Sequence, residues 1–306
     1  MTRYLLRRLW AALVTLFVVI TISFFLMRLA PGGPFSRERA FPPEVLKNIE
    51  AKYDLDKPLF VQYTLYLKRI IFEFDLGPST RYADRSVNEL VQSGFGYSLR
   101  VGLGALFVAL FVGLVSGLLA ALNHNKTIDH VAMSFSMIGV SVPDFVLANL
   151  LVMIFGLGLQ WLPAAGVDDW MSYILPCTTL GLIYAASIAR LTRGGMLEIL
   201  HQDFVRTARA KGLSESLIIR RHTLRGGLLP VISYLGPATA GMLTGSLVVE
   251  KIFNIPGLGR FLIDAAINRD YTMAMGATIV FAGLLIGMNI IVDCVYGFLD
   301  PRVTYS

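Results

Sequence analysis

The chain has 306 residues, of which 55% are hydrophobic and 16% are charged, and its formal net charge is +6. Soluble domains carry about 25% charged residues, so this composition excludes an ordinary soluble enzyme. Two cysteines, Cys177 and Cys294, exclude a disulfide-stabilised secreted framework, and the basic balance leaves a membrane surface or nucleic acid as its cause.

Six long blocks of the sequence carry almost no charge: 9–27, 101–122, 131–159, 172–189, 228–249 and 272–292. A helix needs about 20 mostly apolar residues to cross the roughly 30 Å of hydrocarbon in a bilayer. Lipid tolerates only helices or closed barrels, and the blocks lack the alternating pattern of a barrel. The sequence therefore predicts an all-α, polytopic membrane protein with six transmembrane helices.

The first block follows Arg3, Arg7 and Arg8, which also suits a signal peptide. A cleaved signal has a shorter apolar core and a small-x-small exit, whereas this block runs to Met27 without such a site. We expect an uncleaved first helix.

The third block contains the one charge within a predicted span, Asp144, beside Pro143. An intramembrane carboxylate is by default a functional hypothesis. The alternative is that it satisfies backbone groups freed by the proline, and we favour this alternative from the sequence.

Lys and Arg gather on one side of the predicted membrane. The segments 1–8, 123–129, 190–227 and 297–306 hold 13 of them in 63 residues, against 12 in the 103 residues of 30–97, 160–171 and 248–270. The positive-inside rule makes the first set cytoplasmic. Both termini are then expected inside, and the net charge needs no nucleic-acid patch to explain it.

Segment 30–97 is expected on the outer surface. Val45, Ile49 and Tyr53 recur at a four-residue spacing and predict a helix over 44–54. A second stretch, 59–74, is rich in aromatic residues and Leu/Ile, so the segment is expected to form a small helical cap.

The cytoplasmic segment 190–227 carries eight basic residues and three acidic ones. Residues 196–210 have helical composition, and Gly212 suits the left-handed position after a helix. Ser214 can cap a second helix with Glu215 in its first turn. On charge alone, we favour a basic loop that only fixes topology or touches anionic lipid.

The outer segment 248–270 contains a Pro256-Gly257-x-Gly259 turn flanked by apolar residues. Such a turn needs a special backbone, and by itself it indicates no more than a re-entrant connector.

A family resemblance rests on these two loops. Residues 204–213, Phe-Val-Arg-Thr-Ala-Arg-Ala-Lys-Gly-Leu, with Arg221-His222-Thr223-Leu224 and Leu228-Leu229-Pro230 after them, resemble the cytoplasmic coupling signature of ABC importer permeases. The closest version is that of the peptide and nickel permease family, within it the oligopeptide branch. Residues 250–259 with Asn268-Arg269-Asp270-Tyr271 resemble the same family's last outer loop. Further matches are Arg28-Leu29-Ala30-Pro31-Gly32, Tyr53-Asp54-Leu55-Asp56-Lys57-Pro58, and Leu162-Pro163 with Gly166.

Two departures from the broad coupling motif are plain. Arg206, Thr207 and Ala208 stand where the motif has Glu-Ala-Ala, and Arg225 stands where it has a proline. Both replacements are common in the peptide branch, and they forbid carrying over a glutamate's role to position 206.

The resemblance implies a type I ABC importer permease fold with a large periplasmic segment after helix one. It implies an ATP-driven importer in a bacterial inner membrane, working by alternating access with a second permease, two ATPase subunits and a periplasmic peptide-binding protein. ATP and Mg²⁺ would be bound by the ATPases, since the chain has no Gly-x4-Gly-Lys-[Ser/Thr] motif.

The resemblance also implies site residues. The residues implied to contact the ATPase are Arg206, Thr207, Ala208, Arg209, Ala210, Lys211, Gly212 and His222. The residues implied to contact the docked binding protein are Glu250, Phe253, Pro256, Gly257 and Gly259. We expect no catalytic residue, no metal and no bound cofactor, because the four histidines lack ligand spacing and no hydrolase motif occurs.

The sequence leaves the substrate open among oligopeptides, dipeptides, nickel and other small solutes of the family. A self-sufficient secondary transporter is a distant alternative, which would be expected to carry more intramembrane charges or an inverted repeat. The expected organisation is an N-terminal helix with its periplasmic cap (1–93), a five-helix permease core (94–297) with the coupling loop 190–227, and a cytoplasmic tail (298–306).

Overall fold

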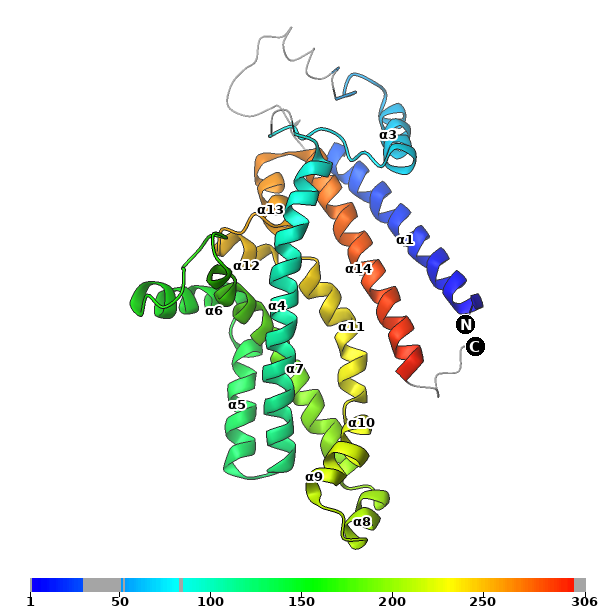
Figure 1. Ribbon diagram of the computed structural model, residues 1–306. Helices are drawn as coiled ribbons and strands as arrows, with labels where there is room; N and C mark the ends of the chain where they lie inside the picture. Colours follow the sequence, from blue (N-terminus) through cyan, green and yellow to red (C-terminus); the bar gives the residue numbers. More distant parts are fainter. Residues whose placement is uncertain (1, 30–50, 52, 83–84, 300–306) are drawn as a thin grey trace. The chain divides into compact units, whose positions relative to one another are not determined.

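The computed structural model describes residues 2–29, 51, 53–82 and 85–299 (Figure 1). These residues form helices, turns and one isolated backbone bridge between Pro78 and Ser86. They divide into two compact units. The first comprises the described residues up to Gly96 with Pro256–Gly283, and the second comprises Tyr97–Ile255 with the described residues from Leu284 onward.

The helices follow one another along the chain as coloured in Figure 1. They are α1 (Thr2–Leu29), α3 (Leu59–Lys68), η1 (Arg69–Glu73), α4 (Val87–Leu122), α5 (Thr127–Ser141), α6 (Asp144–Leu151), η2 (Val152–Gly158), η3 (Trp170–Tyr173), α7 (Ile174–Leu200), α8 (Asp203–Ala210), α9 (Glu215–Ile218), η4 (Ile219–Thr223), α10 (Leu224–Gly227), α11 (Leu229–Leu243), α12 (Leu247–Ile252), α13 (Leu258–Asn268) and α14 (Tyr271–Leu299).

Five helical stretches are long and apolar enough to cross a membrane. They are Leu6–Leu29, Val87–Leu122, Trp170–Leu200, Leu229–Ile252 and Tyr271–Ile291. Each contains one of the predicted apolar blocks or most of it, so the all-α, polytopic prediction is confirmed for the described residues.

The sixth block is broken. α5 and the continuous stretch Asp144–Gly158 pass the same test only as a pair, and they meet at an angle of 109°. Pro143 has no N–H to continue a helix and disfavours helical geometry in the residue before it; Val142 is accordingly extended, with φ −103° and ψ 126°. The predicted span over 131–159 is therefore two helices that meet at the proline break.

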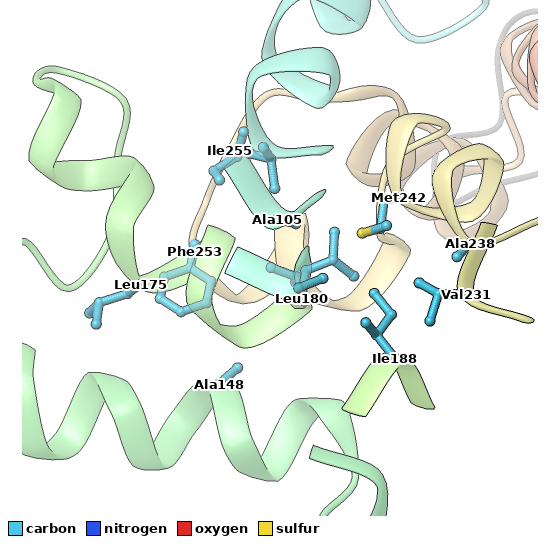
Figure 2. Close-up of a cluster of buried hydrophobic side chains, with 13 residues drawn as sticks. Ala105, Ala148, Leu175, Leu180, Ile188, Val231, Ala238, Met242, Phe253 and Ile255 are labelled. Carbon is cyan, nitrogen blue, oxygen red and sulfur yellow. The ribbon is translucent and has the colours of Figure 1, made fainter. Parts of the chain in front are cut away.

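The main apolar core of the second unit is shown in Figure 2. Its members come from α4, α6, α7, α11 and α12, together with Phe253 and Ile255 beyond α12. Small side chains let the helices approach closely: a Cβ at Gly139 of α5 would collide with the carbonyl oxygen of Leu182 in α7. Close packing of small residues is how membrane helices associate without a hydrophobic driving force between them.

In the first unit, aromatic rings join α1 to α3. Phe24 is fully buried and lies 5.4 Å from the Tyr63 ring and 5.6 Å from the Tyr66 ring of α3. The Tyr63 hydroxyl is 2.7 Å from Oγ1 of Thr21. The predicted helix over 44–54 lies largely outside the described residues, and the predicted stretch 59–74 is α3 followed by η1.

Asp270, at the start of α14, joins that helix to residues 79–80 through hydrogen bonds to its carboxylate. Its carboxylate is buried and accepts hydrogen bonds from the Ser79 hydroxyl, from the backbone N–H of Thr80 at 3.2 Å and from that of Met273 at 3.0 Å. A buried carboxylate is stable only when its oxygens are satisfied in this way.

Candidate functional site

The basic segment 190–227 folds into short helices beyond α7. α7 ends at Leu200, Gln202 is extended, and α8 starts at Asp203. The one helix expected over 196–210 is therefore two helices. The carbonyl of Gln202 accepts the N–H groups of Val205 and Arg206, so the new helix begins with its own hydrogen bonds.

α8 is amphipathic and lies on a small core of its own. Val205 and Ala208 of α8 pack with Ile218 of α9, and Ile199 of α7 covers them. Seven of the eight residues expected to meet an ATPase are exposed: Arg206, Thr207, Arg209, Ala210, Lys211, Gly212 and His222. The eighth, Ala208, is buried in the small core and supports the helix from beneath.

Gly212 forms the bend between α8 and α9, as the sequence predicts. Its φ is +76°, a left-handed conformation that costs other residues energy. Its N–H donates to the Arg209 carbonyl at 2.9 Å, and the Leu213 N–H donates to the Ala208 carbonyl at 3.3 Å. The end of α8 is thereby closed.

Ser214 begins α9 by position but differs from the expected cap. Its hydroxyl makes no capping hydrogen bond within the described chain. Its carbonyl instead accepts the N–H groups of Leu217 and Ile218, both at 3.0 Å.

An ion pair crosses the glycine bend. Arg209 donates from Nε to Oε1 of Glu215 at 2.8 Å and from Nη2 to Oε2 at 3.4 Å. The hydrogen bonds from Arg209 hold the pKa of the Glu215 carboxyl below its usual value, and the carboxylate raises the pKa of Arg209. Helical periodicity does not reveal this pair, because its partners lie six residues apart on either side of a turn.

A second ion pair joins α5 to α7. Asp129, in the first turn of α5, is 2% exposed and accepts from Arg193 at 2.7 Å (Nε) and 2.8 Å (Nη2). The backbone N–H of Asn125 donates to the same carboxylate at 2.9 Å, and His124 Nδ1 lies 3.5 Å away. Sequence reasoning missed this pair, since the partners are 64 residues apart and no local pattern connects them.

In segment 248–270, the buried positions of two candidate residues differ from the expectation that they face a partner. Glu250 and Phe253, in the second unit, are fully buried. The Glu250 carboxylate accepts from the Ser98 hydroxyl at 2.7 Å, and the Phe253 carbonyl accepts from the Gly166 N–H at 2.9 Å. Neither side chain is available to a docked protein in this conformation.

The remaining candidates of that loop belong to the first unit. Gly257 and Gly259 are buried at the start of α13, and Pro256 is half-buried. The exposed side chains of segment 248–256 include Lys251 and Asn254. Asn254 has a φ of +56°, a conformation that asparagine tolerates better than most residues. These two residues were not candidates from the sequence.

Asp144 is half-buried and is the first residue of α6. Its Oδ1 accepts the N–H of Phe145 at 2.8 Å. A carboxylate in the first turn is also favoured by the helix dipole.

Within the described residues, no group of three His, Cys, Asp or Glu side chains could hold a metal ion. The geometry of segment 190–227 instead provides an exposed basic helix with a fixed bend, which suits contact with another protein.

Comparison with known proteins gives two family matches. The family described as "Binding-protein-dependent transport system inner membrane component" matches residues 113–305. The family of the N-terminal part of such membrane components matches residues 1–84.

Full-length relatives carry consistent names. The "Oligopeptide transport system permease protein OppB" of Haemophilus influenzae is 51% identical, and that of Escherichia coli K12 is 50% identical, each over 100% of both chains. The "Dipeptide transport system permease protein DppB" of Bacillus subtilis is 46% identical over 99% of this chain and 98% of its own.

Two solved structures share the fold. The MetNI methionine ABC transporter in an inward-facing conformation matches with a TM-score of 0.59 at 16% identity, over 69% of this chain and 97% of the other. An amino acid ABC transporter with histidines matches with a TM-score of 0.53 at 20% identity, over 71% and 95%.

Proposed function

Because the chain belongs to the family of binding-protein-dependent transport system inner membrane components, we propose that it is a permease subunit of an ATP-driven importer of oligopeptides. The observation that carries the substrate class is the full-length identity of about half to relatives named as oligopeptide permeases. The membrane-spanning helices of the chain supply half of a translocation pathway, and a second, homologous permease supplies the other half.

The coupling role rests on the geometry of α8. Its exposed face carries Arg206, Arg209 and Lys211, and its buried face is fixed on α7 and α9. A rigid element transmits a displacement that a flexible loop would absorb. We infer that α8 and Gly212 seat on a separate ATPase subunit, which binds ATP and Mg²⁺, so that this chain is not itself an enzyme.

The partners follow from this arrangement. Two ATPase subunits dock on the cytoplasmic side, one on each permease, and a peptide-binding protein delivers substrate from the periplasm. The excess of Lys and Arg in segments 1–8, 123–129, 190–227 and 297–306 supports a cytoplasmic position for these segments in a bacterium, and with them for both termini. Segment 30–97 then forms a large periplasmic segment within the N-terminal region 1–93, ahead of a core over 94–297 and a tail over 298–306.

At the outer loop, we assign supporting and contacting roles to different residues. The buried Glu250 and Phe253 hold the loop in shape, as Gly257 and Gly259 do at the start of α13. The exposed Lys251 and Asn254 face the binding protein.

A dipeptide importer is the second candidate, because one relative at 46% identity is named as a dipeptide permease. Uptake of labelled di-, tri- and pentapeptides by a deletion strain, with and without this chain restored, separates the two. Restored uptake of tri- and pentapeptides supports the oligopeptide proposal. Restored uptake of dipeptides alone favours the second candidate, and restoration of no peptide contradicts both.

A further inference from the structure

A cavity of about 410 Å³ lies where the third span breaks. Its walls come from three places in the second unit: the end of α5 with Val142, Pro143 and Asp144, the middle of α7, and Tyr234 of α11. A water molecule occupies about 30 Å³ of liquid, so the space holds far more than a structural water.

The cavity lies at membrane depth. Tyr184 and Ser187, which line it, are near the midpoint of the candidate span Trp170–Leu200, and Tyr234 belongs to the candidate span Leu229–Ile252. Non-helical backbone at this depth is tolerated only where it is buried in protein or lines a water-filled space. The extended backbone at Val142 and Pro143 meets that condition by forming part of the cavity wall.

The carboxylate of Asp144 indicates that the cavity would bind a positively charged group. Among the described residues, no Lys, Arg or His forms an ion pair with Asp144, although its side chain is half-buried. A charged side chain within a span almost always faces the bundle interior or an aqueous cavity. Three residues that bear hydroxyl groups, Tyr184, Ser187 and Tyr234, line the cavity together with Asp144.

The rim of the cavity is apolar. Val140, which lines it, and Phe145, next to Asp144, are 50% and 52% exposed. Apolar side chains at the rim suit packing against a second permease, which would enclose the polar space between the two subunits.

We propose that this cavity is a substrate subsite that binds the positively charged amino terminus of a peptide, with Asp144 as its counter-ion. An ammonium group offers three N–H donors and no acceptor. The carboxylate of Asp144 accepts one in a charge-assisted hydrogen bond, and the cavity hydroxyls can accept the others. The inference rests on the proposed peptide transport and adds to it a residue and a part of the substrate.

Binding to the detergent-solubilised complex, without the binding protein, tests the site directly. The complex contains this chain, the second permease and both ATPase subunits, and the probes are labelled trialanine and N-acetyl-trialanine in equilibrium dialysis. Acetylation removes the charge, so we expect trialanine to bind at least about tenfold more tightly, the lower end of what a hydrogen bond to a charged group is worth. Equal binding of the two peptides, or binding of neither, overturns the proposal.

Variants assign the effect to the carboxylate. Asp144→Asn is expected to abolish the preference for trialanine, and Asp144→Glu to retain it. Asp56→Asn is the matched control, because Asp56 is an exposed carboxylate that does not line the cavity. A preference that survives in Asp144→Asn contradicts the proposal. Should this variant fail to assemble, the comparison of the two peptides in the native complex still decides.

A failure of the proposed transport function can be distinguished from a failure of the amino-terminal subsite. If the native complex, reconstituted with its binding protein and ATP, takes up no trialanine, peptide transport itself is contradicted. If it takes up trialanine but the solubilised complex binds both peptides equally, only the amino-terminal subsite is contradicted.

Discussion

At position 212 the backbone conformation, and not steric crowding, limits which residue types are tolerated. Its φ is +76°, and among the described residues other than its two chain neighbours no atom lies within 4 Å of where a Cβ would stand. A substitution there would therefore change the bend between α8 and α9 without any collision. The same bend is bridged by Arg209 and Glu215, so backbone and side chains fix one geometry together.

Replacing Gly212 by valine is expected to weaken coupling. A left-handed conformation costs a non-glycine residue roughly 1–2 kcal/mol, which corresponds to a factor of about 5–30 in an equilibrium. Co-purification of the ATPase subunits and ATP-driven peptide uptake should fall by a factor in that range. Gly212→Asn is the matched control, because asparagine tolerates this conformation, and it should retain most of both. Unchanged coupling in the valine variant would mean that the loop only sets topology.

The pair between Arg209 and Glu215 predicts a pH dependence of this loop. The pKa of Glu215 is lowered in the folded loop. The contribution of the pair is thus fully present above the ordinary carboxyl pKa and is lost as the pH falls through the lowered one. Hydrogen exchange of the Gly212 and Leu213 amides, which donate to Arg209 and Ala208, should stay slow at neutral pH after correction for intrinsic rates and become faster only in acid.

In Glu215→Gln, the amides at the bend should exchange as fast at neutral pH as they do in the native chain in acid. Asp203→Asn is the control, since Asp203 forms only a 3.4 Å contact with Arg206 between two strongly exposed side chains and such pairs contribute little. Equal exchange in the native chain and in Glu215→Gln at neutral pH would show that the pair does not hold the bend.

Among the elements, α7 connects the membrane to the basic loop. α5 packs on it at Gly139, the aspartate–arginine pair joins the two helices, and α8 follows its last turn. A displacement of α8 would therefore reach the α5–α6 break, and the cavity there, through packed helices.

Loss of Arg193 is expected to destabilise this connection. Arg193→Leu removes the Arg193 hydrogen bonds to the buried Asp129 carboxylate, which keeps the Asn125 N–H and the nearby His124. The loss of a hydrogen bond to a charged group costs about 1.5–3 kcal/mol. The thermal unfolding midpoint of the solubilised complex should fall clearly. Arg190→Leu, on an exposed position of the same helix, loses only a 3.1 Å contact from Nη2 to Sδ of Met137. Because a thioether is a weak acceptor, this variant should have a smaller effect. If both variants unfold alike, the pair between α5 and α7 is not a structural link.

For the whole molecule, hydropathy and charge predict the spans because the bilayer imposes length and composition on each helix separately. Leu6–Leu29 and Tyr271–Ile291 follow in this way. The proline break at Pro143 is expected from the sequence, but its angle of 109° is not, because proline can kink a helix or end it and the surrounding packing decides.

The sequence predicts less of the candidate site than of the membrane spans. Gly212 is identified from its residue type, since few other residues adopt its conformation. The burial of Glu250 and the partner of Asp129 depend on residues far away in sequence, Ser98 and Arg193, and no local pattern encodes such contacts.

Uptake of labelled trialanine into liposomes tests the account most directly. The two permeases are reconstituted either alone or with both ATPase subunits, with the binding protein outside and ATP inside. The account predicts uptake only in the complete system, at a rate that falls to background when ATP is omitted. Equal uptake by the permeases alone would show a self-sufficient transporter and contradict the proposed dependence on a separate ATPase.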